Sequence, residues 1–140
     1  MPSVAQARLR ALSRPEALRL TVEILLTYAH VRRLERGRDL EQVMARVRAS
    51  RRRTNHGQAV DRAAALRLGD AVTRVLRLLP TDDRCLVRSL VLSSLLTRRG
   101  LPVALVIGVR TSPQFAAHAW VEHAGRPLLA AGGYERLTEL

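Results

Sequence analysis

Residues 84–123 read RCLVRSLVLSSLLTRRGLPVALVIGVRTSPQFAAHAWVEH, and this stretch decides the fold. Residues 85–99 space their leucines and valines as an amphipathic helix does. Residues 103–109 form a nearly continuous apolar, β-branched run, which is typical of a buried strand. A turn at 111–113 then leads into a second predicted strand over 115–122. The stretch therefore predicts a helix followed by an antiparallel pair of strands.

The flanking segments add one strand and three helices. Ala124 and Gly125 predict a hairpin turn, followed by a third strand over 126–130. The three predicted helices run from Ser13 to near Gly37, from Asp39 to the basic patch at 51–53, and from Gln58 to Leu79 before Pro80, with a loop at 54–57. In the first of them the residues at helical spacing are Leu18, Val22, Leu25, Leu26 and Tyr28. Helices that precede an antiparallel sheet indicate an α+β fold.

The composition fits one folded domain over residues 1–140, with a helical, basic part at 1–80 and a helix-plus-sheet core at 81–140. Since 47% of the residues are hydrophobic, a disordered chain is not expected. No uncharged apolar run is long enough for a membrane span, and the N-terminus lacks the continuous apolar segment of a signal peptide. The expected compartment is the cytoplasm, where the single cysteine stays reduced.

Positive charge is concentrated in the first part of the chain. The net charge is +12, all 24 basic residues are arginine, and residues 1–80 hold 17 of them against 7 acidic residues. Such an excess attracts nucleic acid, an anionic membrane surface or an acidic protein, and it is equally typical of solvated helix faces. The charge alone leaves these interpretations open.

Cys85 and His118 are the residues that could carry chemistry. Cys85 falls in the first turn of its helix, just after possible caps at 81–83, where the helix dipole favours a thiolate. His118 lies in the second strand, and a sheet packed on that helix could bring it to the thiol as a general base. On the same strand face Trp120 would shield the imidazole or line a substrate groove. Taken singly, each residue is also typical of an ordinary core position.

Four segments together resemble the lasso peptide biosynthesis B2 proteins: CLVRSL at 85–90, LLTRRG at 95–100, LVIGV at 105–109 and FAAHAWVE at 115–122. The resemblance covers about residues 60–137 and is strongest over 84–128. It implies a transglutaminase-like, papain-related fold in which a Cys-bearing helix packs on a small antiparallel sheet. It also implies a leader peptidase that cleaves a ribosomally made precursor peptide, with Cys85 as nucleophile and His118 as base.

The resemblance further implies partners. A B2 protein of this length is similar to those that work with a separate leader-binding B1 protein, a RiPP recognition element. A cyclase similar to asparagine synthetase then closes the ring of the released core peptide. The basic N-terminal helices are the candidate docking surface for the B1 protein or for an acidic leader. No cofactor and no metal are expected.

The sequence departs from that family at the third catalytic group, an Asp on the strand after the histidine strand. With a two-residue turn, paired positions sum to 249, so His118 should face Ala131. Residues 129–133 read LAAGG and hold no carboxylate. The orienting group would then be Glu135, if Gly132–Gly133 folds it back, or a backbone carbonyl, or water. For the oxyanion, the Cys85 N–H is one expected donor, and Gln114 is a second by residue type alone.

Other classes of function remain open. The missing carboxylate is compatible with a non-catalytic scaffold of the same fold, and the same fold could transfer an acyl group to an amine. A basic, helical nucleic-acid-binding protein would explain the charge, although aromatic residues for base stacking are scarce. The four histidines show no metal-ligand spacing, and His118 and His123 are expected on opposite strand faces.

Overall fold

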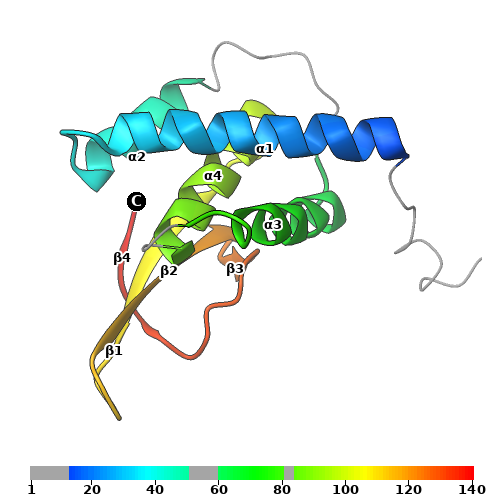
Figure 1. Cartoon of the computed structure of the whole chain (residues 1–140). Helices are drawn as coiled ribbons and strands as arrows, with labels where there is room; N and C mark the ends of the chain where they lie inside the picture. The colour runs from blue at the N-terminus through cyan, green and yellow to red at the C-terminus, as the bar shows by residue number, and fades with distance from the viewer. Residues whose placement is uncertain (1–12, 51–59, 81–83) are drawn as a thin grey trace, which may run out of the picture.

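A computed structural model describes residues 13–50, 60–80 and 84–140 and has the predicted α+β architecture (Figure 1). The helices are α1 (Arg14–Glu35), α2 (Leu40–Ser50), α3 (Arg62–Leu76) and α4 (Arg84–Arg98). The strands are β1 (Ala104–Arg110), β2 (Ala116–His123), β3 (Arg126–Pro127) and β4 (Glu135–Glu139). The predicted loop at 54–57, the basic patch at 51–53 and the caps at 81–83 lie outside the described residues.

Helix α4 is the centre of the fold. It contacts α1, α2 and α3 as well as β1 and β2, and Figure 1 shows it between the other helices and the sheet. Ten of its 15 residues are buried, among them serine and threonine side chains. A helix that is apolar on nearly every side is stable only with neighbours all round. The hydrophobic core therefore joins both parts of the chain around α4.

The sheet is antiparallel with the strand order β3-β2-β1-β4. The predicted hairpin register is confirmed, because Glu122 pairs with Pro127 and His123 with Arg126. The predicted third strand is too long, since pairing stops at Pro127 instead of continuing to residue 130. Strand β4 was not predicted. The chain turns back after residue 133 and pairs with β1, on the side of β1 opposite β2.

Side-chain caps explain where the helices begin. Ser13 and Glu16 form a capping box at α1, and an oxygen of Asp39 accepts the Gln42 N–H at the start of α2 (2.9 Å). The prediction that the third helix begins at Gln58 is wrong for the described residues before Arg62. Helix α3 begins there because Asp61 caps it, accepting the backbone N–H of Ala64 at 2.7 Å.

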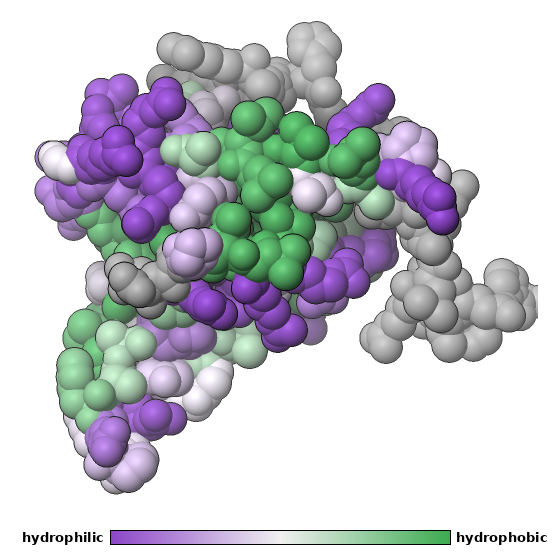
Figure 2. Space-filling view, viewed as in Figure 1, coloured by the Kyte–Doolittle hydropathy of each residue, from purple (hydrophilic) through white to green (hydrophobic). Residues whose placement is uncertain are grey.

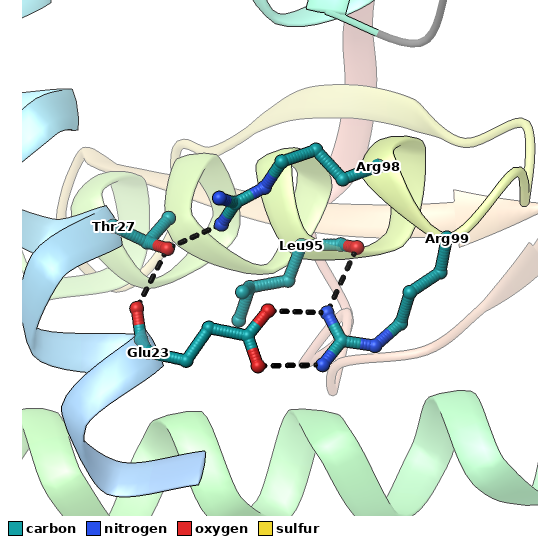
Figure 3. Close-up of polar contacts among 5 residues, drawn as sticks. All are labelled: Glu23, Thr27, Leu95, Arg98 and Arg99. Atoms are coloured by element: carbon teal, nitrogen blue, oxygen red, sulfur yellow. Dashed lines mark hydrogen bonds and ion pairs between the residues drawn. The ribbon is translucent and has the colours of Figure 1, made fainter. Parts of the chain in front are cut away.

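Polar contacts fix α1 on the C-terminal end of α4 (Figure 3). Both guanidinium nitrogens of Arg99 donate to the Glu23 carboxylate, at 3.0 and 2.8 Å, and Arg98 donates to the hydroxyl of Thr27. Thr27 in turn donates to the carbonyl of Glu23, at 2.8 Å. Together with Ile24 and Val31, Thr27 forms the buried face of α1.

The buried face of α1 differs from the predicted apolar stripe. Leu18, Val22, Leu25 and Leu26 are all exposed. Of the residues predicted at helical spacing, Tyr28 alone packs against the core. The reason is that α1 carries apolar side chains on two faces, and spacing cannot tell which of them meets α4.

Candidate active site

Cys85 is the second residue of α4 and is half-buried. Backbone N–H groups in the first helical turn have no acceptor within the helix, so they point toward whatever lies beyond the helix start. One turn along, the Nε of Arg88 is buried and has no hydrogen-bond partner in the described part of the chain. The thiol therefore lies in the first turn of α4, beside unpaired backbone N–H groups and one turn before Arg88.

Two contacts show how α4 lies on β2. Near the middle of β2, the buried hydroxyl of Ser89 donates to the carbonyl of Ala119 (3.1 Å). At the end of β2, His123 Nδ1 donates to the carbonyl of Pro102, which follows α4 in the chain (2.7 Å). Helix and strand therefore run in the same direction.

This alignment brings Cys85 to the level of His118. Cys85 is four residues before Ser89 on the same face of α4, which is about 6 Å along the helix axis. That distance equals about two residues of a strand. Since Ser89 lies opposite Ala119, the first turn of α4 lies level with the first half of β2, where His118 stands.

A backbone carbonyl holds the imidazole of His118. Nε2 lies 2.8 Å from the carbonyl oxygen of Ala130. Because a carbonyl can only accept a hydrogen bond, Nε2 must carry the proton and donate it. In the neutral ring the lone pair then belongs to Nδ1, which is the nitrogen able to accept a proton. Of the orienting groups expected from sequence, the structure shows the backbone carbonyl, one residue from the expected Ala131.

Two aromatic rings flank His118. Trp120 stacks with its centroid 5.9 Å from the imidazole and the planes 24° apart, and Tyr134 lies closer, at 4.9 Å. The guanidinium of Arg110 sits 5.0 Å from the centre of the Tyr134 ring, a cation–π distance. These contacts restrict rotation of the imidazole, which stays partly exposed to solvent. Tyr134 was missed by sequence reasoning, although an aromatic residue directly after Gly132–Gly133 was its available signal.

Trp120 is itself fixed by a buried carboxylate. Its indole N–H donates to Glu122 at 2.8 Å, and Arg136 of β4 binds the other oxygen of Glu122 at 2.5 Å. The Glu122 side chain is only 6% exposed, and its carboxylate forms an ion pair with Arg136. The network ties β2 to β4 across β1 and holds the ring that stacks on His118. Trp120 is buried at 3% exposure, and its ring stacks on His118 from the same strand.

Gly108 of β1 gives the Trp120 ring its space. Gly108 pairs with His118 in the sheet, and a Cβ placed on it would lie 2.6 Å from two ring carbons of Trp120. It would also lie 2.8 Å from the carbonyl oxygen of Glu135. The aromatic ring and the backbone of β4 can thus approach here only because position 108 has no side chain.

The remaining predicted site residues lie away from this group. Glu135 pairs with Val109 on the far side of β1 from His118, and its side chain is exposed. It does not take the place of the missing carboxylate, because β4 joins the opposite edge of β1. Gln114 is exposed in the bend between β1 and β2, and no contact links it to Cys85 or His118.

The described residues show neither a metal-binding cluster nor a membrane-spanning helix. Residues 13–50, 60–80 and 84–140 contain no group of three or more Cys, His, Asp or Glu side chains placed to hold a metal ion. None of the helices in these ranges is both long enough and apolar enough to cross a bilayer.

Comparison with known proteins supports the fold derived above. A search of curated proteins and a search of solved structures found no match. The family model of the transglutaminase-like superfamily matches residues 24–140, which includes the Cys-bearing helix and the whole sheet. The match begins within α1, well before residue 60, where the resemblance was expected to start. Because it spans most of the chain, the chain belongs to the transglutaminase-like superfamily.

Proposed function

We propose that this protein is a cysteine peptidase that removes the leader peptide from a ribosomally made lasso peptide precursor. The superfamily to which it belongs includes cysteine peptidases. The observation that carries the proposal is the hydrogen bond from His118 Nε2 to the Ala130 carbonyl. It leaves Nδ1 as the basic nitrogen, at the level of the sheet where the helix bearing Cys85 begins.

In the proposed mechanism, Nδ1 of His118 takes the proton of the Cys85 thiol. The sulfur then attacks the carbonyl carbon at the leader–core junction and forms a tetrahedral oxyanion. The Cys85 N–H, in the first turn of α4, is the proposed donor to that oxyanion. The imidazolium protonates the departing core amine as the C–N bond breaks. Water, deprotonated by His118, then hydrolyses the thioester and releases the leader carboxylate and the thiol.

The proposed partners follow from the same role. The precursor peptide is the substrate, a separate leader-binding B1 protein presents it, and the asparagine synthetase-like cyclase receives the released core. The proposed site of action is the cytoplasm. No cofactor is needed, because the thiol, the imidazole and water balance every step.

The single cysteine of the chain permits a direct test. Iodoacetamide alkylation measured by mass spectrometry reports on Cys85 alone, across a pH series. His118→Gln should slow alkylation near neutral pH and lower precursor cleavage by about 10²- to 10⁴-fold. His123→Gln is the matched control, since His123 lies on the same strand and bonds to the Pro102 carbonyl. Equal alkylation rates in the two variants would remove the base role of His118.

Cys85→Ala tests whether the protein is an enzyme at all. The purified protein is incubated with the B1 protein and the precursor peptide whose genes lie next to its own, and the masses of the products are measured by mass spectrometry. The proposal expects no cleavage by Cys85→Ala and a leader ending in a free carboxylate with the unchanged protein. Unchanged cleavage by Cys85→Ala would instead indicate a scaffold role.

Acyl transfer is a second candidate function, because the same Cys85 thioester could be attacked by an amine in place of water. The half-buried thiol and the two aromatic rings around His118 favour it to the extent that they limit access of water. Adding a primary amine such as cadaverine to the reaction distinguishes the two. An amide product in place of the free carboxylate would favour transfer over hydrolysis.

A further inference from the structure

The groove between α1 and α3 is a second surface with a chemistry of its own. It has a volume of about 470 Å³. Its lining residues are Ala17, Leu20, Thr21, Ile24 and Leu25 of α1, with Ala71, Arg74, Val75, Leu78 and Leu79 of α3 and the turn that follows. Nearly all of them are apolar, and Arg74 is the charged member. The groove is thus a concave apolar channel with a cation at its edge.

The apolar area continues from the groove over the outer face of α1. Eight large hydrophobic residues of the described ranges are exposed, and five of them lie here: Leu18, Val22, Leu25, Leu26 and Leu78. Figure 2 shows a hydrophobic area over α1 and α3, bordered by hydrophilic residues. Exposed hydrophobic patches with a polar border mark surfaces where a protein binds another molecule.

Helix α1 shows why this face needs a partner. It buries Ile24, Thr27 and Val31 against the core, yet Leu18 is 66% exposed and Leu26 67%. A helix apolar on two faces is normally covered on both. The two faces of α1 predict a further layer, packed on α1 and α3 from outside.

The charges around the groove indicate which kind of partner would bind there. Arg67 and Arg74 lie seven residues apart on one face of α3, and both are exposed. With Asp70 of α3 and Arg77 directly after it, the exposed charges from residue 67 to 77 are three arginines against one aspartate, a net +2. A second copy of this chain would carry the same net charge of +12, so the two copies would repel each other. A partner with acidic side chains would be attracted.

The shape of the surface favours a helix over a lipid layer. A groove between two helices matches the diameter of a third, which inserts apolar side chains at positions i, i+3, i+4 and i+7. A flat bilayer surface would touch the outer leucines of α1 and leave the groove empty. We propose that the α1–α3 groove binds an amphipathic helix of a partner protein whose apolar face is flanked by acidic residues. This inference goes beyond the proposed peptidase activity and does not depend on it.

The test uses the full-length protein and two synthetic peptides. Both are fluorescently labelled, about 18 residues long, with leucine at i, i+3, i+4 and i+7. One carries glutamate at the flanking positions and the other lysine. Fluorescence anisotropy should show that the glutamate peptide binds at least about 10-fold more tightly. Equal affinity for the two peptides, or no binding of either, would overturn the proposal.

Three variants locate the binding. Leu78→Glu and Arg74→Glu, both at exposed positions that line the groove, should each weaken the glutamate peptide by about 10-fold. Leu137→Glu is the matched control, because Leu137 is 66% exposed but lies on β4. Circular dichroism checks that all three remain folded. If Leu137→Glu weakens binding as much as Leu78→Glu does, the peptide binds elsewhere and the proposal fails.

Two further measurements address the other occupants. If the protein co-sediments with phosphatidylglycerol vesicles and Leu78→Glu abolishes this, the groove binds an anionic membrane and not a partner helix. If sedimentation velocity shows that the unchanged protein is a dimer and Leu78→Glu a monomer, the groove binds a second copy of this chain. The proposal expects a monomer and no vesicle binding.

Discussion

Replacing Gly108 by alanine is expected to destabilise the protein by about 2 kcal/mol, through a steric conflict at the centre of the sheet. The backbone at this position is not left-handed, so alanine meets no backbone strain there. At an unobstructed position of this kind, Gly→Ala would stabilise by about 0.4–1 kcal/mol, because it restricts the unfolded chain. The sign of the effect therefore depends on the contacts of the new methyl group.

Those contacts are too short for the methyl group to fit. Carbon atoms pack at about 3.5–4.0 Å, whereas the new Cβ would lie 2.6 Å from two ring carbons of Trp120 and 2.8 Å from the carbonyl oxygen of Glu135. The ring cannot rotate away without losing its hydrogen bond to Glu122. Overpacking of this kind costs about 1–3 kcal/mol, which exceeds the gain from the unfolded state. The melting temperature should fall by about 6–8 °C.

The assay is urea unfolding followed by tryptophan fluorescence, because Trp120 is the only tryptophan of the chain. Gly108→Ala should lower the midpoint and shift the native emission to longer wavelength, as the ring moves. Gly100→Ala is the control, since its left-handed backbone (φ +81°) is strained by alanine while nothing lies within 4 Å. It should cost about 1 kcal/mol without any change of emission. A neutral or stabilising Gly108→Ala would refute the reasoning.

Substitutions at three further positions test the contacts that hold the elements together, each by urea unfolding. Arg136→Met should lower the free energy of unfolding by about 1–2 kcal/mol, because it leaves the buried Glu122 carboxylate without its cation. The loss is kept to this size because Arg136 is itself 45% exposed. No loss of stability would mean that water takes the place of the guanidinium. Asp61→Ala should cost about 1 kcal/mol by removing the cap of α3, whereas Asp61→Asn should be nearly neutral. Arg99→Met should cost no more than about 1 kcal/mol, and high salt should reduce the difference, since the ion pair with Glu23 is partly exposed.

The hairpin shows which part of the sheet could be predicted from sequence. Ala124 and Gly125 both have positive φ, at 50° and 74°, as a two-residue turn of this type requires. The turn sets the register, which is why the pairing of His123 with Arg126 was predicted correctly. Strand β4 was not predictable in the same way. All five of its residues are exposed, so no buried face repeats along it, and its pairing with β1 uses backbone groups.

The first helix shows the limit of hydrophobic spacing. Leu18, Val22, Leu25 and Leu26 recur at helical intervals as clearly as the residues that α1 buries. The choice between the two faces is made by α4, which offers Arg98 and Arg99 to Thr27 and Glu23. Such long-range partners, more than 70 residues apart, are not visible in a local pattern. Spacing predicted the helix correctly and its orientation wrongly.

At the site, sequence pattern can find side chains but not backbone acceptors. Cys85 and His118 stood out because few residue types serve as nucleophile and base. The carbonyl that accepts the His118 hydrogen bond could not be identified from sequence, because every residue has a backbone carbonyl. The path of the chain from Leu128 to Ala130 decides which carbonyl lies next to the imidazole. The sequence of residues 129–133 therefore showed only that no acidic side chain lies in this segment.

A carbonyl in this place can do part of what a carboxylate does. An orienting carboxylate fixes the tautomer of the imidazole and also stabilises the positive charge that the ring gains during the reaction. The Ala130 carbonyl retains the first effect, because it accepts the Nε2 proton and leaves Nδ1 basic. For the second effect a carbonyl supplies only a dipole, which attracts a cation more weakly than a full negative charge does. The aromatic rings of Trp120 and Tyr134 offset part of this, since their faces attract a cation. For the proposed peptidase we therefore expect slower turnover than a complete Cys-His-Asp triad would give.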